Sequence, residues 1–243
     1  MPGRSKTRPP PPTDTTQNGK YAKGPDKGPL YTVRAHPQWP SFTPPCWPGI
    51  RPPLTVAGFF AVEFAYYWFH RFSHTVRWMW ATHAVHHSSR EYVLPSAVRL
   101  GWTEFFSLGW TFFAALVLIG FPPTVVAVLL GANLIYQFPL HTEAVRRLPN
   151  WVEAVFNTPS HHRAHHASET EFLDCNFGGV LIVWDRVFGT FRAEPHDRAL
   201  RYGLVHDLDS RNPVRIALHE WRRLFGDIAR ARGKRCAAPT LRG

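Results

Sequence analysis

The sequence predicts an all-α protein: an integral membrane helical hairpin with a cytosolic, histidine-rich cap that could hold two metal ions. Three observations predict this fold class. Histidines cluster at helical spacing, a long charge-free apolar stretch is divided by two prolines, and the excess of basic over acidic side chains is confined to the ends of the chain. The histidines concerned are His70, His74, His83, His86, His87, His141, His162, His165 and His166.

Residues 1–53 are expected to form a proline-rich, basic N-terminal tail and not a domain. This stretch contains 14 of the 23 prolines, and it has eight Lys or Arg side chains against two acids. Proline lacks a backbone N–H and breaks helices and strands, and a segment with so little apolar surface cannot build a core. We therefore predict that the segment is extended or disordered.

The other end of the chain is basic as well. Residues 211–243 have nine basic side chains against two acids and are predicted to form a helix or tail, whereas residues 54–210 have 11 against 13. The net charge of +11 therefore resides in the two ends. No nucleic-acid-binding motif accompanies it, so we expect the basic ends to be solvated or to face an anionic membrane surface, and we expect no nucleic acid partner.

An apolar segment, residues 54–69, leads directly into His70 and contains one acid, Glu63. An acid at such a position is costly unless it is paired or serves a site. Because Glu63 lies seven residues before His70, the two share nearly the same helix face. Glu63 is expected either to orient a ligand histidine by hydrogen bonding or to mark a segment that lies partly outside lipid.

The histidine clusters are the chemical signal. Residues three or four apart share a helix face, so HRFSH, HAVHH and HRAHH each direct two or three imidazoles the same way. Imidazole binds Zn, Cu, Fe and Ni, and nine ligands are too many for one ion, which indicates two ions side by side. His161 is left open, because adjacent side chains on a helix point about 100° apart and only one of them need face a metal. The remaining histidines, including His196 and His206, lie outside the clusters.

Residues 105–140 contain no charged side chain, and Pro122 and Pro123 divide them into two arms, 105–121 and 124–140. Each arm would be about 25 Å long as a helix, at the short end for a hydrocarbon layer of about 30 Å. Two buried helices of a soluble protein would look similar. A membrane hairpin is favoured, and it would return the chain to one side, where the early and late histidines can converge.

Arginines beside the apolar segments predict the orientation of this hairpin. By the positive-inside rule they place the metal site on the cytoplasmic side. They are Arg71, Arg77, Arg90, Arg99, Arg146 and Arg147.

Five segments carry a resemblance to a known family. They are EFAYYWFHRFSH (63–74), WMWATHAVHHSS (78–89), YQFPLHTE (136–143), FNTPSHHRAHH (156–166) and LDCNFGGVLIVWDRVFGTF (173–191). On these segments the chain resembles the fatty acid hydroxylase/sterol desaturase superfamily between about residues 63 and 221. Within it, the chain is most similar to the alkylglycerol monooxygenase-like branch, on NTPSHHRAHH, the NFGG block and YGLVHDL (202–208).

The resemblance implies a membrane-embedded catalytic domain over 54–210 with a di-iron cap. It implies that two iron ions are bound by the nine histidines named above, with zinc as an alternative occupant. Gln137 falls four residues before His141, where some members have a further histidine, and is expected to be a weak ligand or to orient one. Asp174, Asn176, Trp184 and Asp185 are expected to support the ligand helices or to hydrogen-bond to the ligands. The chain departs from the family at its start, where relatives have apolar spans.

The resemblance further implies O2-dependent hydroxylation or desaturation of a lipid, and in this branch cleavage of a glycerol ether lipid. A separate electron donor is expected as a partner, either a reduced pterin or another redox partner. Two alternatives stay open: a sterol or fatty-acid desaturase/hydroxylase, and a membrane metal-binding or transport protein. Ligands at the ends of apolar segments, and not inside them, argue against transport.

Overall fold

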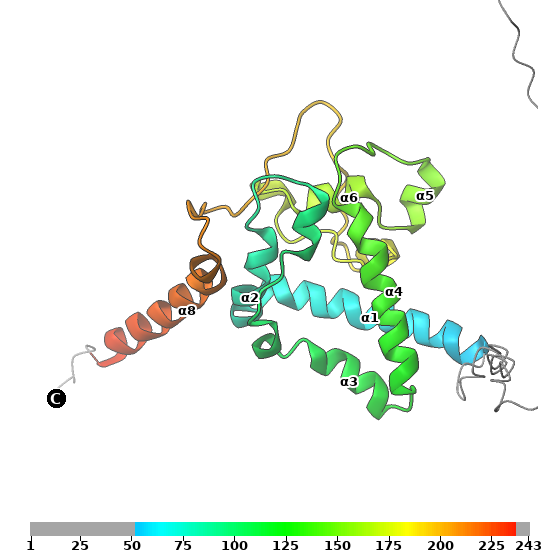
Figure 1. Cartoon of the computed structure of the whole chain (residues 1–243), viewed down its shortest axis with the longest axis horizontal. Coiled ribbons are helices and arrows are strands. Elements are labelled where there is room, and N and C mark those ends of the chain that lie inside the picture. Colours follow the sequence, from blue (N-terminus) through cyan, green and yellow to red (C-terminus); the bar gives the residue numbers. More distant parts are fainter. Residues whose placement is uncertain (1–51, 237–243) are drawn as a thin grey trace, which may run out of the picture. The chain divides into compact units, whose positions relative to one another are not determined.

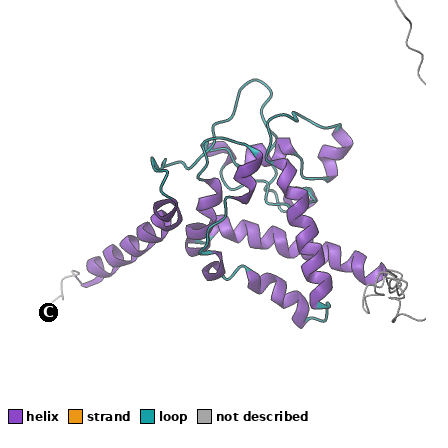
Figure 2. Ribbon diagram, in the orientation of Figure 1, coloured by secondary structure: helices purple, strands orange, loops and turns teal. Residues whose placement is uncertain are grey.

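The computed structural model describes residues 52–236, so the predicted N-terminal tail lies outside the described residues except for Pro52 and Pro53. Within 52–236 all regular structure is helical, as Figure 2 shows, apart from two isolated bridges, Phe156 with Leu181 and Ala167 with Tyr202. The elements are α1 (Pro52–Thr75), α2 (Arg77–His87), η1 (Leu94–Val98), η2 (Glu104–Ser107), α3 (Trp110–Leu118), α4 (Pro123–Gln137), η3 (Phe138–Leu140), α5 (Asn150–Val155), α6 (Pro159–His165), η4 (Thr170–Phe172), α7 (Val183–Val187) and α8 (Pro213–Cys236). The all-helical part of the predicted fold class is thus confirmed for the described residues.

Helix α1 is the centre of the packing. It contacts α2, α3 and α4, which can be followed in Figure 1. Pro52 and Pro53 occupy its first turn, where proline is tolerated because those N–H groups have no partner within a helix. Val62 and Ala65 of α1 form a buried cluster with Leu116 of α3 and Val126 of α4. This cluster binds the α3–α4 hairpin to the helix that carries the first two histidines.

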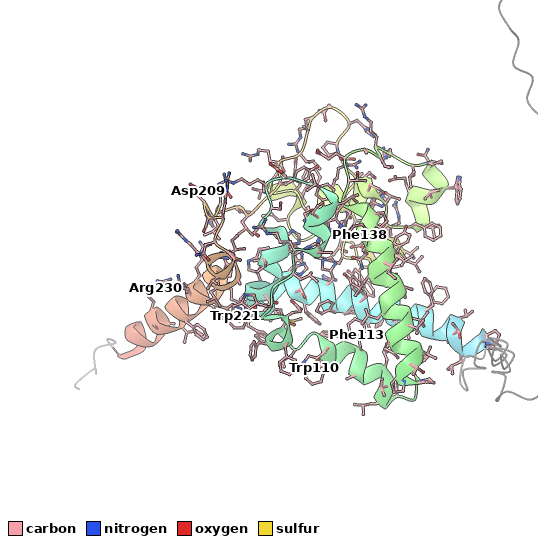
Figure 3. The ribbon with its side chains drawn as sticks, viewed as in Figure 1. Trp110, Phe113, Phe138, Asp209, Trp221 and Arg230 are labelled. Carbon is pink, nitrogen blue, oxygen red and sulfur yellow. The ribbon has the colours of Figure 1, made fainter. Side chains whose placement is uncertain are left out.

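The first arm of the predicted hairpin is shorter than expected. Residues 105–121 were predicted to be one helix, but the chain forms η2, turns at Leu108 with φ of +61°, and only then begins α3. Gly109 follows the turn with a right-handed backbone conformation, and it lies so close to α1 that an added Cβ would overlap the Phe69 ring. A residue with a side chain could not approach α1 as closely at this position. Trp110 and Phe113 follow on α3, as Figure 3 shows.

The second arm is a continuous helix, as predicted. Pro123 begins α4, and η3 extends it to Leu140. Among the described residues, Pro123–Leu140 is the one helical stretch long and apolar enough to cross a membrane, with a mean hydropathy of 1.4. Only 28% of it is buried inside the protein. Its C-terminal end leads directly to His141.

Helix α8 packs on α2. The Arg77 guanidinium of α2 lies 2.8 Å from the Glu220 carboxylate, and the Trp221 indole donates a 3.2 Å hydrogen bond to the hydroxyl of Thr103. Ile216 and Ala217 are buried in this contact region. Figure 3 shows Trp221 and Arg230 on this helix. The basic C-terminal segment thus contains one 24-residue helix.

Candidate metal centre

The nine predicted histidines converge in two groups, and within each group the ligand atoms all lie within 4.8 Å of one another. The early and late clusters of the sequence therefore meet. The first group is His70, His74, His83, His87 and His165. The second group is His86, His141, His162 and His166.

Helices α2 and α6 each supply histidines to both groups. On α2, His83 and His87 are four residues apart and share one face, while His86 turns to the second group. At α6 the division is reversed: His162 and His166, the residue that caps the C-terminus of α6, are four residues apart and join the second group, and His165 joins the first. Because the same two helices carry both groups, the groups must lie side by side.

The distances between ring nitrogens suit a shared metal ion. In the first group, Nε2 of His83 lies 3.2 Å from Nε2 of His70 and 3.3 Å from Nε2 of His87. In the second group, Nε2 of His141 lies 3.3 Å from that of His86 and 3.1 Å from that of His162. Nitrogens bound to one ion at about 2.0–2.1 Å, with angles of 90–110° between them, are about 2.8–3.4 Å apart.

Backbone carbonyls fix the direction of three rings. The Nδ1 atoms of His70, His141 and His165 lie 2.9, 3.1 and 2.7 Å from the carbonyl oxygens of Phe177, Gln137 and Cys175. A carbonyl oxygen only accepts a hydrogen bond, so Nδ1 carries the proton and Nε2 presents a lone pair. This is how proteins commonly orient a metal-binding histidine.

Several ring nitrogens in these groups are buried and have no hydrogen-bond partner in the protein. They include the Nε2 atoms of His74, His165 and His166. A buried polar atom without a partner is costly and calls for an explanation such as a bound ion. Lone pairs that face one another at about 3 Å repel unless a cation lies between them. The residues present thus fit a two-metal centre.

Burial keeps these imidazoles neutral. It lowers the pKa of His86 to about 3 and that of His141 to about 4. Burial, followed by the charge of neighbouring imidazoles, also lowers the pKa of His83, His87, His162 and His166 well below the usual value. Neutral imidazole is the metal-binding form, so at neutral pH a cation need not displace protons from these groups.

The loop after Cys175 supports the first group. The Asp185 carboxylate of α7 accepts the backbone N–H groups of Phe177 and Gly178, both at 2.7 Å, and the Thr190 hydroxyl at 2.6 Å. The Asn176 amide donates to the carbonyls of His161, at 2.9 Å, and Arg192, at 2.7 Å. These bonds hold the carbonyls that orient His70 and His165. The side chains were expected from the NFGG block, but the carbonyl acceptors had no sequence signal.

Asp174 lies beside the first group. One of its carboxylate oxygens is 3.5 Å from Nδ1 of His74, while 58% of the side chain is exposed. Its backbone has a φ of +58°. Asp174 is therefore placed to orient His74 from the solvent side.

Glu63 and Gln137 make their side-chain hydrogen bonds away from the histidines. Glu63 accepts the backbone N–H groups of Val180 and Leu181, both at 2.9 Å, and the Asn133 amide. Gln137 accepts the Tyr66 hydroxyl at 2.9 Å and donates to Asn133. The expectation that the Glu63 carboxylate hydrogen-bonds to a ligand histidine is corrected: it ties α1 to α4 and to the 180–181 backbone. Gln137 reaches a histidine through its carbonyl, not its amide.

His161 lies outside both groups. It is buried, and its Nε2 is 2.9 Å from the Glu153 carboxylate, which also accepts the Ser160 hydroxyl at 2.7 Å. The pair joins α5 to the start of α6. The sequence left open whether His161 faces a metal ion, and in the structure its ring faces the Glu153 carboxylate.

A cavity of about 230 Å³ reaches the first group from outside. His74, His87 and His165 line its inner wall, beside the apolar side chains of Trp80 and Leu204. No histidine of the second group lines it. The cavity is smaller than the roughly 300–1,000 Å³ typical of sites for drug-sized ligands. It suits a small molecule or one end of a larger one.

Two adjacent polyhistidine groups on an all-helical scaffold, with seven of their nine histidines buried, are suited to hold two metal ions. The chain belongs to the fatty acid hydroxylase family, whose sequence model matches residues 55–190. No solved structure matches the chain.

Within this family, the chain is similar to alkylglycerol monooxygenases and, at lower identity, to a cholesterol hydroxylase. The chain is 44% identical to human alkylglycerol monooxygenase over 163 residues, which is 67% of this chain and 36% of the relative. It is 48% identical to the Danio rerio alkylglycerol monooxygenase over 150 residues, 62% of this chain and 32% of the relative. It is 30% identical to cholesterol 25-hydroxylase of Rattus norvegicus over 164 residues, 62% of this chain and 51% of the relative. The chain thus spans about a third of the length of the alkylglycerol monooxygenases it matches.

Proposed function

We propose that the chain is a membrane-bound di-iron oxygenase that hydroxylates glycerol ether lipids. The observation that carries the proposal is the convergence of nine histidines into two adjacent groups of five and four. The family supports oxidation chemistry, and the alkylglycerol monooxygenases are more similar to the chain than the cholesterol and ornithine lipid hydroxylases, at 36–48% against 28–31% identity.

The nine histidines would hold the two ions. Iron is proposed because activation of O2 needs a metal that changes oxidation state, whereas zinc has no redox chemistry. Bound iron would supply the electrons that activate O2 and the oxidising power to break an inert C–H bond. The protein would keep the imidazoles neutral by burial and orient three of them, His70, His141 and His165, through the carbonyls of Phe177, Gln137 and Cys175.

The proposed reaction consumes one lipid, one O2, two electrons and two protons, and gives a hydroxylated lipid and water. Hydroxylation of the carbon next to the ether oxygen forms a hemiacetal, which collapses to an aldehyde and glycerol. The electrons must come from a separate donor, a reduced pterin or another redox partner.

Membrane insertion is proposed through the α3–α4 hairpin. Pro123–Leu140 is apolar enough to cross a bilayer, and large apolar side chains around the hairpin are exposed: Leu118 by 87%, Ile119 by 73% and Ile135 by 75%. Exposure of such an apolar surface to water is unfavourable, and the hydrocarbon layer of a membrane would cover it. We propose that the metal site lies on the cytoplasmic side, because arginines flank the apolar segments at the ends where the histidines lie, and such basic flanks favour the cytoplasm.

Iron analysis combined with a lipid assay tests this function. Full-length protein in nanodiscs, loaded with iron and supplied with O2 and a chemical reductant, should release a fatty aldehyde from an alkylglycerol. His86→Ala should abolish release, and the exposed His196→Ala is the matched control that should retain it. Retained iron with no aldehyde from any ether lipid would contradict the proposed substrate.

The same assay separates two alternatives. A sterol or fatty-acid hydroxylase or desaturase would modify a ring or an acyl chain and release no aldehyde, so cholesterol and a phospholipid are included as substrates. A metal-binding or transport protein would bind iron or zinc but oxidise none of the lipids. Of the two, the hydroxylase alternative is the stronger, since cholesterol 25-hydroxylase is among the relatives.

A further inference from the structure

A stack of aromatic rings connects the second histidine group to the protein surface. The Tyr92 ring lies between His141, with ring centroids 5.6 Å apart and planes at 21°, and Tyr202, with 4.9 Å and 23°. Its centroid is also 5.4 Å from that of His166. Tyr92 is buried, Tyr202 is half-buried, and the Tyr202 hydroxyl donates a 3.2 Å hydrogen bond to the carboxylate of Glu143, which is exposed.

A structural role accounts for only part of this arrangement. The Tyr92 hydroxyl donates to the carbonyl of Leu140 at 3.0 Å, and so helps to place His141, the next residue. Tyr202 makes no such contact with a histidine of the second group among its described interactions. What Tyr202 adds is a second oxidisable ring and, through Glu143, a base that can accept its proton.

We propose that Tyr92 and Tyr202 form a relay that delivers electrons, one at a time, to the metal site when O2 has oxidised it and no lipid is bound. This inference rests on the proposed function. An oxidised site without substrate would otherwise attack its own ligands. Tyrosine is one of the most readily oxidised side chains, and direct ring contact permits electron transfer from Tyr202 through Tyr92 to the second group.

The proton partners give the relay its direction. The partner of Tyr92 is a backbone carbonyl, which is not a base, so an oxidised Tyr92 cannot lose its proton to it. The partner of Tyr202 is a carboxylate, which can accept a proton. Each passage would send one electron from Tyr202 through Tyr92 to the metal site, move the phenolic proton to Glu143 and leave a neutral Tyr202 radical. A surface reductant of the thiol or enediol class would then donate a hydrogen atom and restore the phenol. Two passages would supply two electrons, which with two from the irons and four protons would reduce one O2 to two waters.

Tyr66 provides a matched control. Its ring lies 5.6 Å from that of His70, as close to a proposed ligand as Tyr92 is to His141. However, its hydroxyl donates to the Gln137 amide oxygen, and its other ring contact is with Phe69, which is hard to oxidise. Tyr66 has the proximity but neither the onward ring nor the base.

The test is electron paramagnetic resonance of the iron-loaded, full-length protein in nanodiscs. The reduced protein is mixed with O2 in the absence of lipid substrate and frozen at successive times. We expect a tyrosyl radical whose spectrum narrows when ring-deuterated tyrosine is incorporated. Its yield should fall at least ten-fold in Tyr92→Phe and Tyr202→Phe, fall in Glu143→Gln, and stay unchanged in Tyr66→Phe. Iron content and the optical change on iron oxidation are measured in every sample, since a purely structural role would alter those instead.

Each outcome decides the matter. A tyrosyl radical that depends on both Tyr92 and Tyr202 supports the relay. Iron that is bound and oxidised by O2 without any tyrosyl radical, or a radical that survives Tyr92→Phe, overturns the relay and leaves the oxygenase intact. A radical removed by Trp80→Phe would place the route at the first group and overturn it as well. Failure to bind iron, or to oxidise it, overturns the proposed function and the relay with it.

Discussion

Replacement of Asp185 should weaken both the fold and the first metal position. The carboxylate is fully buried and accepts the backbone N–H groups of Phe177 and Gly178. In Asp185→Ala both N–H groups lose their partner, at a cost of about 1–3 kcal/mol each, or about 2–6 kcal/mol together. That is a large part of a typical folding free energy of about 5–15 kcal/mol. Asp185→Asn keeps one acceptor and should cost about half as much.

The second effect of this change concerns iron. The Phe177 carbonyl accepts the hydrogen bond that orients His70, so a displaced loop should lower iron affinity at the first group by about 10–100-fold, the usual effect of losing an orienting partner. Stability is measured by chemical denaturation of iron-free protein in detergent, and affinity by iron titration of Asp185→Asn. Asp197→Asn, a change at an exposed aspartate, is the control and should alter stability by no more than about 0.5 kcal/mol. Lower stability with unchanged iron affinity would refute the idea that this loop orients His70.

Three further predictions follow from the packing and the charges. Gly179→Ala would place a Cβ 2.1 Å from the Asn133 amide and should destabilise the protein by about 1–3 kcal/mol, measured by thermal denaturation. Gly131→Ala is the control and should not destabilise it, because nothing lies within 4 Å of an added Cβ there. Equal melting temperatures of the two variants would contradict the close approach of Gly179 to Asn133. His161→Ala should keep two irons per chain, and loss of one would make His161 a ligand. Burial lowers the pKa of His86 to about 3 and that of His141 to about 4, so below pH 6.5 the unfolded chain binds more protons than the folded one. Each of the two histidines should therefore reduce the free energy of unfolding of the metal-free protein by about 2 kcal/mol by pH 5. Urea midpoints that do not differ between pH 7 and pH 5 would contradict this prediction.

Which histidines of one helix lie together could be predicted from the sequence because helical spacing alone decides which side chains share a face, whereas the convergence of the early and late histidines was predicted from the apolar hairpin between them. His83 and His87, or His162 and His166, are four residues apart wherever their helices lie. Their division into two groups could not be predicted, since it depends on how α2 and α6 cross. The His86 ring points away from His83 and His87 and contacts His141, 55 residues further along the chain, and no local sequence pattern indicates this contact.

Other features escaped the sequence for equally physical reasons. The carbonyls that orient His70 and His165 belong to Phe177 and Cys175, and every residue has a carbonyl, so residue identity carries no signal. The turn at Leu108 is followed by the close approach of Gly109 to Phe69, a contact between segments 40 residues apart that no local pattern indicates. Glu63 was singled out as an acid in an apolar segment, with its role left open between orienting a histidine and lying partly outside lipid, but two of its partners, the N–H groups of Val180 and Leu181, are again backbone atoms.

The iron content of the purified, full-length protein tests the central claim most directly. Two adjacent histidine groups predict two irons per chain by elemental analysis. They also predict that His162→Ala, which removes one of the four histidines of the second group, keeps the iron of the first group and loses the other. One iron or none in the wild-type protein, or two irons in the His162→Ala variant, would contradict the account.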